Sequence, residues 1–343
     1  MISLTGDCLL VFSIATSILA IFTKRSIKAY IFWISSLAVI TAFLLLILAF
    51  ITSDFSVKNV FLNSSTIKPL IYKIAGSWAS HEGSMLLYVS MLSFISSLYT
   101  KVVNYQGNTR NVQITILAFI QILFLFFIYY TSNPFDNFKF APEQGLGLNP
   151  VLQDKALSIH PPLLYMGYVS YVTLYVNAIL LLLIPKERTT LIKDSLRLSG
   201  FALIMLTAGI GLGAWWAYRE LGWGGYWFFD PVENISLMPW IAGISLHHFL
   251  LVTNKSRKFF YWSVITSFVA FLLTLYGLFF VRSGIITSVH SFAFSRERGF
   301  YLFVICSILT FLAFAAFIGR KKENYTGSKD NVASVLTIRD KAI

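Results

Sequence analysis

Histidine is the residue type in this 343-residue chain best suited to metal or proton chemistry near neutral pH, because an imidazole titrates close to neutrality and ligates metal ions. Zinc would need three or four close histidine, cysteine or carboxylate ligands. Haem iron needs one or two axial ligands, a flat apolar wall and polar groups near its propionates. The scattered histidines therefore favour haem over zinc. They are His81, His160, His247, His248 and His290.

His160 stands directly before two prolines in the segment "LSIHPPLLYMGYV". Pro161 and Pro162 predict that the backbone is fixed at this point, just before a helix begins, because the fixed φ of proline suits a helix entry. An imidazole held there would make a well-positioned ligand. The structural alternative is a boundary histidine that hydrogen-bonds lipid headgroups or a loop, and the local sequence does not separate the two.

His290 lies in the segment "SVHSFAFSRERG", with Arg282 before it and Arg296 and Arg298 after it. Guanidinium groups bind carboxylates through paired hydrogen bonds. Arginines close to an imidazole could therefore hold the propionates of a haem whose iron the imidazole ligates. This makes His290 a candidate ligand and Arg282 a candidate propionate contact.

His247 and His248 lie within an apolar segment, about 20 Å along a helix that starts near residue 235, given a rise of about 1.5 Å per residue. An imidazole inside the membrane is costly unless it is hydrogen-bonded or ligating, which favours a functional role. Adjacent helical residues point about 100° apart, so we do not expect both to face one partner. For His81, beside Glu82, we expect a structural pair or a helix-entry contact.

The segment "WAYRELGWGGYWFFDPVENISLMPW", residues 216–240, has seven aromatic residues in its first fifteen positions. Its glycines alternate with aromatic residues, which predicts a turn where backbone and rings approach a flat ligand closely. The alternative is an interfacial belt, because Trp and Tyr gather at membrane surfaces. Belt residues are scattered among spans, whereas these rings share one loop. The candidate platform residues are Trp216, Trp223, Gly224, Gly225, Tyr226, Trp227 and Phe228.

The residues Asp230-Pro231-Val232-Glu233 have the pattern of a helix start. Asp would be the N-cap, Pro the first helical residue, and Glu the residue three positions after the cap. Asp230 is also a candidate contact of the cofactor. We favour the capping role for both acidic residues.

Membrane-spanning helices must position these side chains, because 57% hydrophobic and only 12% charged residues leave too little polar surface for a soluble chain. A spanning helix needs about 20 apolar residues. The sequence predicts an all-α polytopic membrane protein with nine such segments. They lie near residues 7–23, 29–51, 82–99, 113–130, 163–184, 199–217, 235–253, 260–281 and 301–319.

The charge distribution predicts the orientation of the chain. Placing the N-terminus outside and the C-terminus inside puts 18 of the 27 Lys and Arg residues in inner loops and the tail, as the positive-inside rule requires. The long outer segments then form the working surface. Residues 1–319 would form one domain and residues 320–343 a polar inner tail. The net charge of +12 is explained by orientation, so nucleic-acid binding is disfavoured.

Four segments resemble the CcmF family, the haem lyase subunits of a cytochrome c maturation system, which carry a tryptophan-rich "WWD" loop. The first three are "GLGAWWAYRELGWGGYWFFDPVENISLMPW" (211–240), "SWASHEGSMLLY" and "GLGLNPVLQDKALSIHPPLLYMGYV". The fourth is "FVRSGIITSVHSFAFSRERG". They are ordered over residues 76–300, which makes the resemblance specific.

The resemblance implies a role for each matching histidine. His160 and His290 would be outer axial ligands that receive haem transiently over the loop, and His248 would ligate a separate b-type haem in the membrane that reduces the incoming iron. The implied partners are the haem carrier CcmE, a CcmH-like thiol partner and apocytochrome c, together with membrane lipid. The implied reaction joins the haem vinyl groups to the cysteines of a C-x-x-C-H motif.

The chain departs from the family in two respects. Tyr226 and Phe229 stand where the family has Trp, so the aromatic surface survives but an indole hydrogen bond is lost. Family members are also nearly twice this length, and their second in-membrane histidine lies in the half that is missing here. Either a separate chain supplies that histidine or the b-type haem site is incomplete, and we expect a split form whose C-terminal half is a separate chain. The composition suits an organelle-encoded gene, which predicts the mitochondrial inner membrane, with a bacterial inner membrane as the alternative.

Three functions remain open at this point. The first is a haem lyase subunit that positions haem for thioether formation, and the chain length and the "HEGS" segment favour it. The second is a haem translocation or relay protein that loads a carrier without catalysing attachment. The third is a structural membrane scaffold with incidental histidines.

Overall fold

The computed structural model describes residues 1–103, 105, 107–222, 225–288 and 292–320. This part of the chain is nearly all helical and has no strand, apart from an isolated antiparallel bridge between Val57 and Asn137. Nine of its helices are long and apolar enough to cross a membrane, which confirms the nine predicted spans. They are α1 (Ile2–Phe22), α2 (Arg25–Thr52), α5 (His81–Val102), α6 (Gly107–Thr131), α7 (Lys155–Leu183), α8 (Arg188–Glu220), α9 (Pro231–Ser256), α10 (Phe260–Ser283) and α11 (Arg296–Ile318).

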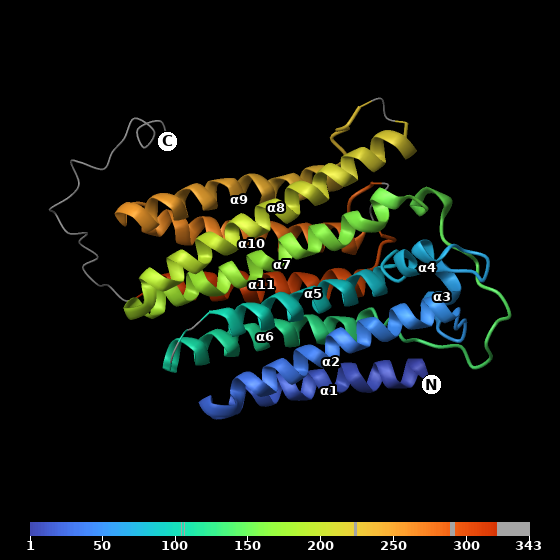
Figure 1. Cartoon of the computed structure of the whole chain (residues 1–343), viewed down its shortest axis with the longest axis horizontal. Coiled ribbons are helices and arrows are strands. Elements are labelled where there is room, and N and C mark those ends of the chain that lie inside the picture. The colour runs from blue at the N-terminus through green and yellow to red at the C-terminus, as the bar shows by residue number, and fades with distance from the viewer. Residues whose placement is uncertain (104, 106, 223–224, 289–291, 321–343) are drawn as a thin grey trace.

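The long helices lie side by side along one axis, and consecutive helices run in opposite directions (Figure 1). Helix α7 is central and packs against α5, α6, α8, α10 and α11. Within its most apolar window, 83% of the residues of α7 are buried, against 22% for α9. Helix α9 therefore lies at the edge of the bundle, where most of its surface must meet lipid or another chain.

The connections differ in length at the two ends of the bundle (Figure 1). One end carries the long connections, including two short helices that the sequence did not predict, α3 (Lys58–Asn63) and α4 (Leu70–Gly76). The backbone of the α6–α7 connection hydrogen-bonds this region, as from Leu146 N to Phe61 O at 2.8 Å. The other end has short turns, such as the 3₁₀ helix η2 (Pro185–Glu187) between α7 and α8. The predicted asymmetry of the loops is present.

The start of α7 differs from the prediction. The helix begins at Lys155, with Asp154 as N-cap accepting from the N–H groups of Ala156 and Leu157 at 2.7 and 3.0 Å. Pro161 and Pro162 therefore lie inside the helix rather than before it. A strong N-cap explains the difference, because the cap stabilises the first turn while the prolines remove only two hydrogen bonds farther along.

Helices α7 and α8 lie very close together because glycines face larger side chains across their interface. A Cβ on Gly167 would come within 2.5 Å of Leu206 Cγ, and a Cβ on Gly209 within 2.9 Å of the backbone N of Leu164. Small residues allow this approach in membrane helix pairs. The close contact brings the backbone of α8 next to the first turns of α7, where His160 lies.

Candidate functional site

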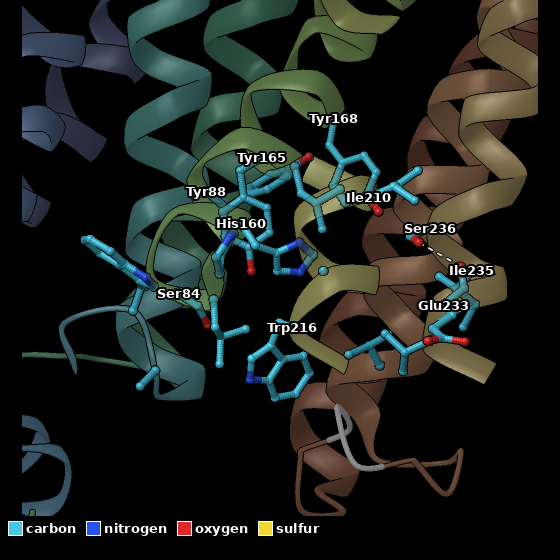
Figure 2. Close-up of a pocket in the computed structure, with 18 of the residues that line it drawn as sticks. Ser84, Tyr88, His160, Tyr165, Tyr168, Ile210, Trp216, Glu233, Ile235 and Ser236 are labelled. Atoms are coloured by element: carbon cyan, nitrogen blue, oxygen red, sulfur yellow. Dashed lines mark hydrogen bonds between the residues drawn. The ribbon is translucent and has the colours of Figure 1, made fainter. Parts of the chain in front are cut away.

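A cavity of about 450 Å³ lies among α5, α7, α8, α9 and α10, at the end of the bundle with the long connections. Its size falls within the range of about 300–1,000 Å³ that is typical of cofactor pockets. Figure 2 shows His160 between Tyr165 and Trp216, with Glu233 and Ser236 of α9 across the cavity. The polar and aromatic lining includes Trp78, Ser84, Tyr88, His160, Tyr165, Tyr168, Trp216, Trp227, Glu233, Ser236 and Arg282.

The imidazole of His160, in the second turn of α7, is held by the backbone of α8. Its Nδ1 lies 2.7 Å from the carbonyl oxygen of Gly209. A carbonyl only accepts hydrogen bonds, so Nδ1 carries the proton, and in the neutral ring the lone pair is on Nε2. A Cβ on Gly213 would approach His160 Cε1 to 2.6 Å, so the ring depends on a glycine there. The structure thus selects the tautomer whose Nε2 can ligate iron.

The end of α8 is tied to the start of α7 beside this imidazole. The indole Nε1 of Trp216 donates to the carbonyl of Val151 at 3.1 Å, and Arg219 forms an ion pair with the N-cap carboxylate of Asp154. The guanidinium of Arg219 also lies 4.4 Å from the ring centre of Trp215. These contacts place the buried Trp216 at the cavity wall, and its role as a platform for a ligand stays a prediction.

Arg282 places a positive charge in the wall of the cavity although it is only 2% exposed. Its guanidinium donates to His81 O and Ser84 Oγ, both at 3.0 Å, and to the hydroxyl of Tyr165 at 2.8 Å. The guanidinium carbon also lies 5.0 Å from the ring centre of Phe292. Among the described residues no carboxylate forms an ion pair with Arg282. A buried cation held only by neutral groups favours an anionic ligand group beside it.

His81 supports Arg282 rather than binding a metal. Its Nδ1 lies 3.2 Å from Nη1 of Arg282, which can only donate, so Nδ1 accepts and Nε2 donates to Ser132 Oγ at 2.6 Å. Both ring nitrogens are thus in use. His81 is the first residue of α5, after the N-cap Ser80, as expected for a helix-entry residue. The structural partners of its ring are Arg282 and Ser132, and not the neighbouring Glu82.

The aromatic loop divides into residues at the cavity and residues facing outwards. Trp216 and Trp227 line the cavity. Tyr226 is 61% exposed and stacks on Tyr218, with ring centres 4.7 Å apart, while Phe228 is 55% exposed. Neither Tyr226 nor Phe228 is part of the lining. A flat ligand in the cavity would therefore meet the two tryptophans first.

Part of the predicted site lies outside the described residues, namely Trp223, Gly224 and His290. Of the neighbouring glycines, Gly222 has φ +63°, a left-handed conformation that explains its residue type, and a Cβ on Gly225 would meet no atom within 4 Å. The predicted turn of the loop runs into residues outside the described part of the chain and stays a prediction.

Asp230 and Glu233 form the predicted cap of α9. The carboxylate of Asp230 accepts from Val232 N at 2.9 Å, and Glu233 Oε2 accepts from the backbone N of Asp230 at 3.2 Å and of Phe228 at 3.1 Å. The capping prediction is confirmed. Ser288 Oγ also donates to Asp230 at 2.7 Å, which ties the segment after α10 to the start of α9.

His248 lies far from the cavity, about 25 Å along α9 from its start, whereas His160 lies about 8 Å along α7. The side chain of His248 is exposed on the bundle surface, and its Nδ1 donates to Ile244 O at 2.9 Å, which leaves the lone pair of the neutral ring on Nε2. His247 instead hydrogen-bonds Ser199 Oγ at 2.8 Å. The two neighbours do face different partners, as their helical spacing predicted.

Sequence reasoning did not single out Tyr88, Tyr165, Tyr168 or Trp78, which all line the cavity. A usable signal was present for one of them. Tyr168 follows His160 by eight residues, a spacing at which two side chains point about 80° apart and still share one broad face of a helix. Tyr88 and Trp78 come from another helix and its preceding turn, and only the packing of α5 on α7 brings them to the site.

The residues present fit a haem. The cavity offers two indole walls, Trp216 and Trp227, and an imidazole at His160 whose tautomer suits iron ligation. The buried guanidinium of Arg282 provides the charge that a propionate needs.

Comparison with known proteins agrees with this chemistry. Residues 78–287 match the family model described as "Cytochrome C assembly protein". The "Cytochrome c-type biogenesis protein CycK" of Rhizobium meliloti (strain 1021) is 45% identical over 285 residues, which cover 83% of this chain and 42% of the relative. The "Cytochrome c-type biogenesis protein CcmF" of Escherichia coli (strain K12) is 42% identical over 294 residues, covering 83% of this chain and 45% of the relative.

The solved structure of "Cytochrome c Heme Lyase CcmF" is similar with a TM-score of 0.79 and 25% sequence identity, over 94% of this chain and 52% of that chain. The chain thus spans less than half the length of the curated relatives named above. The family match covers the helices that build the cavity, from Trp78 before α5 to the end of α10. The chain belongs to the cytochrome c assembly protein family.

Proposed function

We propose that this chain is the haem-holding part of a membrane-bound cytochrome c haem lyase. The observation that carries the proposal is His160, fixed by Gly209 with its lone pair on Nε2, in an aromatic cavity whose wall contains the buried Arg282. Within the described part of the chain, Arg282 forms no ion pair with a carboxylate. Similarity to cytochrome c-type biogenesis proteins supports the same function.

In this proposal the chain acts mainly by positioning the haem, which is the substrate. His160 ligates the iron on one side, and His290 is the proposed second ligand. Trp216 and Trp227 hold the ring faces, and Arg282 binds a propionate. Holding the vinyl groups and the cysteine thiols of apocytochrome c together then makes a bimolecular addition effectively unimolecular. Each vinyl group gains a sulfur and a hydrogen from one thiol, so the atoms balance.

His248 is the proposed ligand of a second, b-type haem within the membrane. Its exposure on the peripheral α9 supports a site completed by another chain, because an imidazole facing lipid alone is costly. A C-terminal half of the family, present as a separate polypeptide, is the proposed source of the opposite ligand. When bound, this haem would supply an electron that keeps the substrate iron ferrous.

The proposed partners follow from this reaction. They are the haem carrier CcmE, a CcmH-like thiol protein, apocytochrome c and the C-terminal half. The cavity end of the bundle is proposed to face outwards, since 18 of 27 Lys and Arg residues then lie inside. The relatives named above are bacterial, which supports a bacterial inner membrane; the mitochondrial inner membrane stays a prediction of the sequence.

A haem relay function is the second candidate. The observation that favours it is the cavity itself, because His160 and Arg282 would hold a haem for transfer as well as for attachment. In this second candidate function the chain would pass haem to a carrier without making the thioether bond.

Optical spectra of the purified chain, alone and with its co-purifying partners, test the proposal. We expect a haem signal in the complex under haem-replete conditions. His248→Ala should remove the in-membrane signal, whereas His160→Ala should spare it and weaken capture of haem from the carrier. Absence of haem from both preparations would exclude both candidate functions. Equal loss of all haem in the two variants would contradict two separate sites.

A further inference from the structure

A second cavity, of about 480 Å³, lies between the starts of α2 and α6. It is at the opposite end of the bundle from the cavity that contains His160. Among the described residues that line it, three are cationic, Arg25, Lys28 and Arg110, and none is acidic. The site is independent of the chemistry described above. The described lining residues are Arg25, Ser26, Lys28, Ala29, Tyr30, Trp33, Gly107, Arg110, Asn111 and Ile114.

The cations of this cavity have donors that the described residues do not satisfy. Lys28 is only 3% exposed, and its ammonium donates to Ile21 O at 2.8 Å and Thr115 Oγ1 at 2.7 Å, which uses two of its three N–H groups. The Nε of Arg110 is buried and has no hydrogen-bond partner within the described chain. A buried ammonium and an orphan guanidinium N–H on one cavity point to an anionic ligand with several acceptor oxygens.

Two helix starts add positive potential at the same place. Helix α2 begins at Arg25 and α6 at Gly107, and both residues line or flank the cavity. Neither helix has an acidic residue in its first turn, and Lys24 before α2 makes no side-chain capping bond. No acidic side chain in either first turn therefore offsets the positive ends of the two helix dipoles, an arrangement that favours phosphate.

Aromatic residues place the cavity at the boundary between membrane and water. The ring centre of Trp33 lies 4.8 Å from the ammonium of Lys101 and 5.7 Å from the guanidinium carbon of Arg110. Tyr30 packs edge-on against Trp33, with ring centres 5.4 Å apart. Trp and Tyr beside Lys and Arg are typical of the interfacial layer. An anion bound here would lie at the depth of lipid headgroups.

An apolar strip leads from the cavity along α2. Tyr30, Ile34 and Leu37 are 62%, 49% and 63% exposed and recur at helical spacing on one face. Such a strip fits an acyl chain that continues from a headgroup held in the cavity. A free phosphate ion has no apolar part that could contact the strip. The shape of the site therefore favours a lipid over a soluble anion.

We infer that this cavity binds the headgroup phosphate of an anionic membrane lipid, through Arg25, Lys28 and Arg110. The acyl chains lie along the exposed strip of α2. Basic pockets between membrane helices on the inner side bind lipids of this class.

Titration of the purified chain in nonionic detergent tests this inference. The unfolding temperature is followed with added phosphatidylglycerol, phosphatidylcholine or inorganic phosphate. We expect the temperature to rise most steeply with phosphatidylglycerol. Arg25→Gln and Arg110→Gln should each weaken its apparent affinity about fivefold, the effect of one charge near the surface. Lys255→Gln, which removes a charge of the same end of the bundle outside the cavity, should leave it unchanged.

Three outcomes would overturn the inference. Equal stabilisation by phosphatidylcholine would show that headgroup charge is not recognised. Inorganic phosphate binding as tightly as phosphatidylglycerol would assign the cavity to a free anion. Equal losses in Arg25→Gln and Lys255→Gln would reduce the effect to general surface charge. Should Arg110→Gln fail to fold, Arg25→Gln alone carries the test, and Arg25→Lys should restore the affinity.

Discussion

Gly213→Ala gives a direct test of His160 as an iron ligand. The added Cβ would lie 2.6 Å from His160 Cε1 and 2.7 Å from its Nδ1. Ordinary contact begins near 3.4 Å, so the ring must move by about 0.8 Å (3.4 minus 2.6). The hydrogen bond from Nδ1 to Gly209 O, at 2.7 Å, cannot survive that displacement unchanged.

Loss of such an orienting partner of a metal-ligating histidine lowers metal affinity by about 10- to 100-fold. We expect a decrease of that size in haem affinity at the cavity, equal to about 1.4–2.7 kcal/mol. The stability of the helix should not fall by a similar amount, because replacing a helical Gly with Ala favours the helix by about 1 kcal/mol. Weaker haem binding without unfolding is therefore the expected result.

Gly211→Ala is the matched control. Gly211 lies on the same helix, and a Cβ there would meet no atom within 4 Å. Both variants carry the same gain in helix propensity, so their difference isolates the contact with His160. Both are best made in a His248→Ala background, with the co-purifying partners present, so that haem titrations followed by optical absorption report on the cavity alone. Equal haem affinities in the Gly211→Ala and Gly213→Ala proteins would refute the proposed ligation.

Three further variants test the surroundings of the cavity. Arg282→Gln should weaken haem capture and lower the free energy of unfolding by about 2 kcal/mol, because buried acceptors lose a charged donor; an unchanged haem affinity would exclude a propionate contact. Asp230→Ala should lower the free energy of unfolding by about 1 kcal/mol, because the N-cap of α9 is lost. An unchanged free energy of unfolding in a thermal melt would mean that Glu233 alone caps the helix. Arg219→Gln should cost about 1 kcal/mol or less, since this arginine is partly exposed, and a thermal melt showing several times that loss would contradict the assigned geometry.

Local sequence determined the elements of this protein. Nine spans could be predicted because an apolar run of sufficient length has few alternatives to a membrane helix. The cap at Asp230 was equally readable, since N-cap, Pro and Glu act within four residues. The position of Pro161 was misread because the capping strength of Asp154, seven residues earlier, outweighs the proline signal.

The candidate ligands could be named from the sequence, but not what surrounds them. Chemistry limited the candidates to five histidines, the prolines after His160 suggested a fixed position, and the family resemblance implied its role as a ligand. The choice of Gly209 as its hydrogen-bond partner depends on the close packing of α7 on α8. Which loop rings reach the cavity was also undetermined, since Trp227 and the outward-facing Tyr226 are neighbours in sequence.

The sequence by itself determined that the chain belongs in a membrane rather than in water. It also determined the number of spans and the residue types able to hold a flat iron-containing ligand. The tertiary structure decided how Arg282 meets His81, 201 positions away in the chain, and how Arg282 also reaches Tyr165 of a third helix. No local pattern encodes such a meeting, because the hydrophobic period specifies which face of a helix is buried and not which helix covers it. Burial then makes the partners obligatory, since a charged group inside the bundle must be hydrogen-bonded by whatever the packing brings to it.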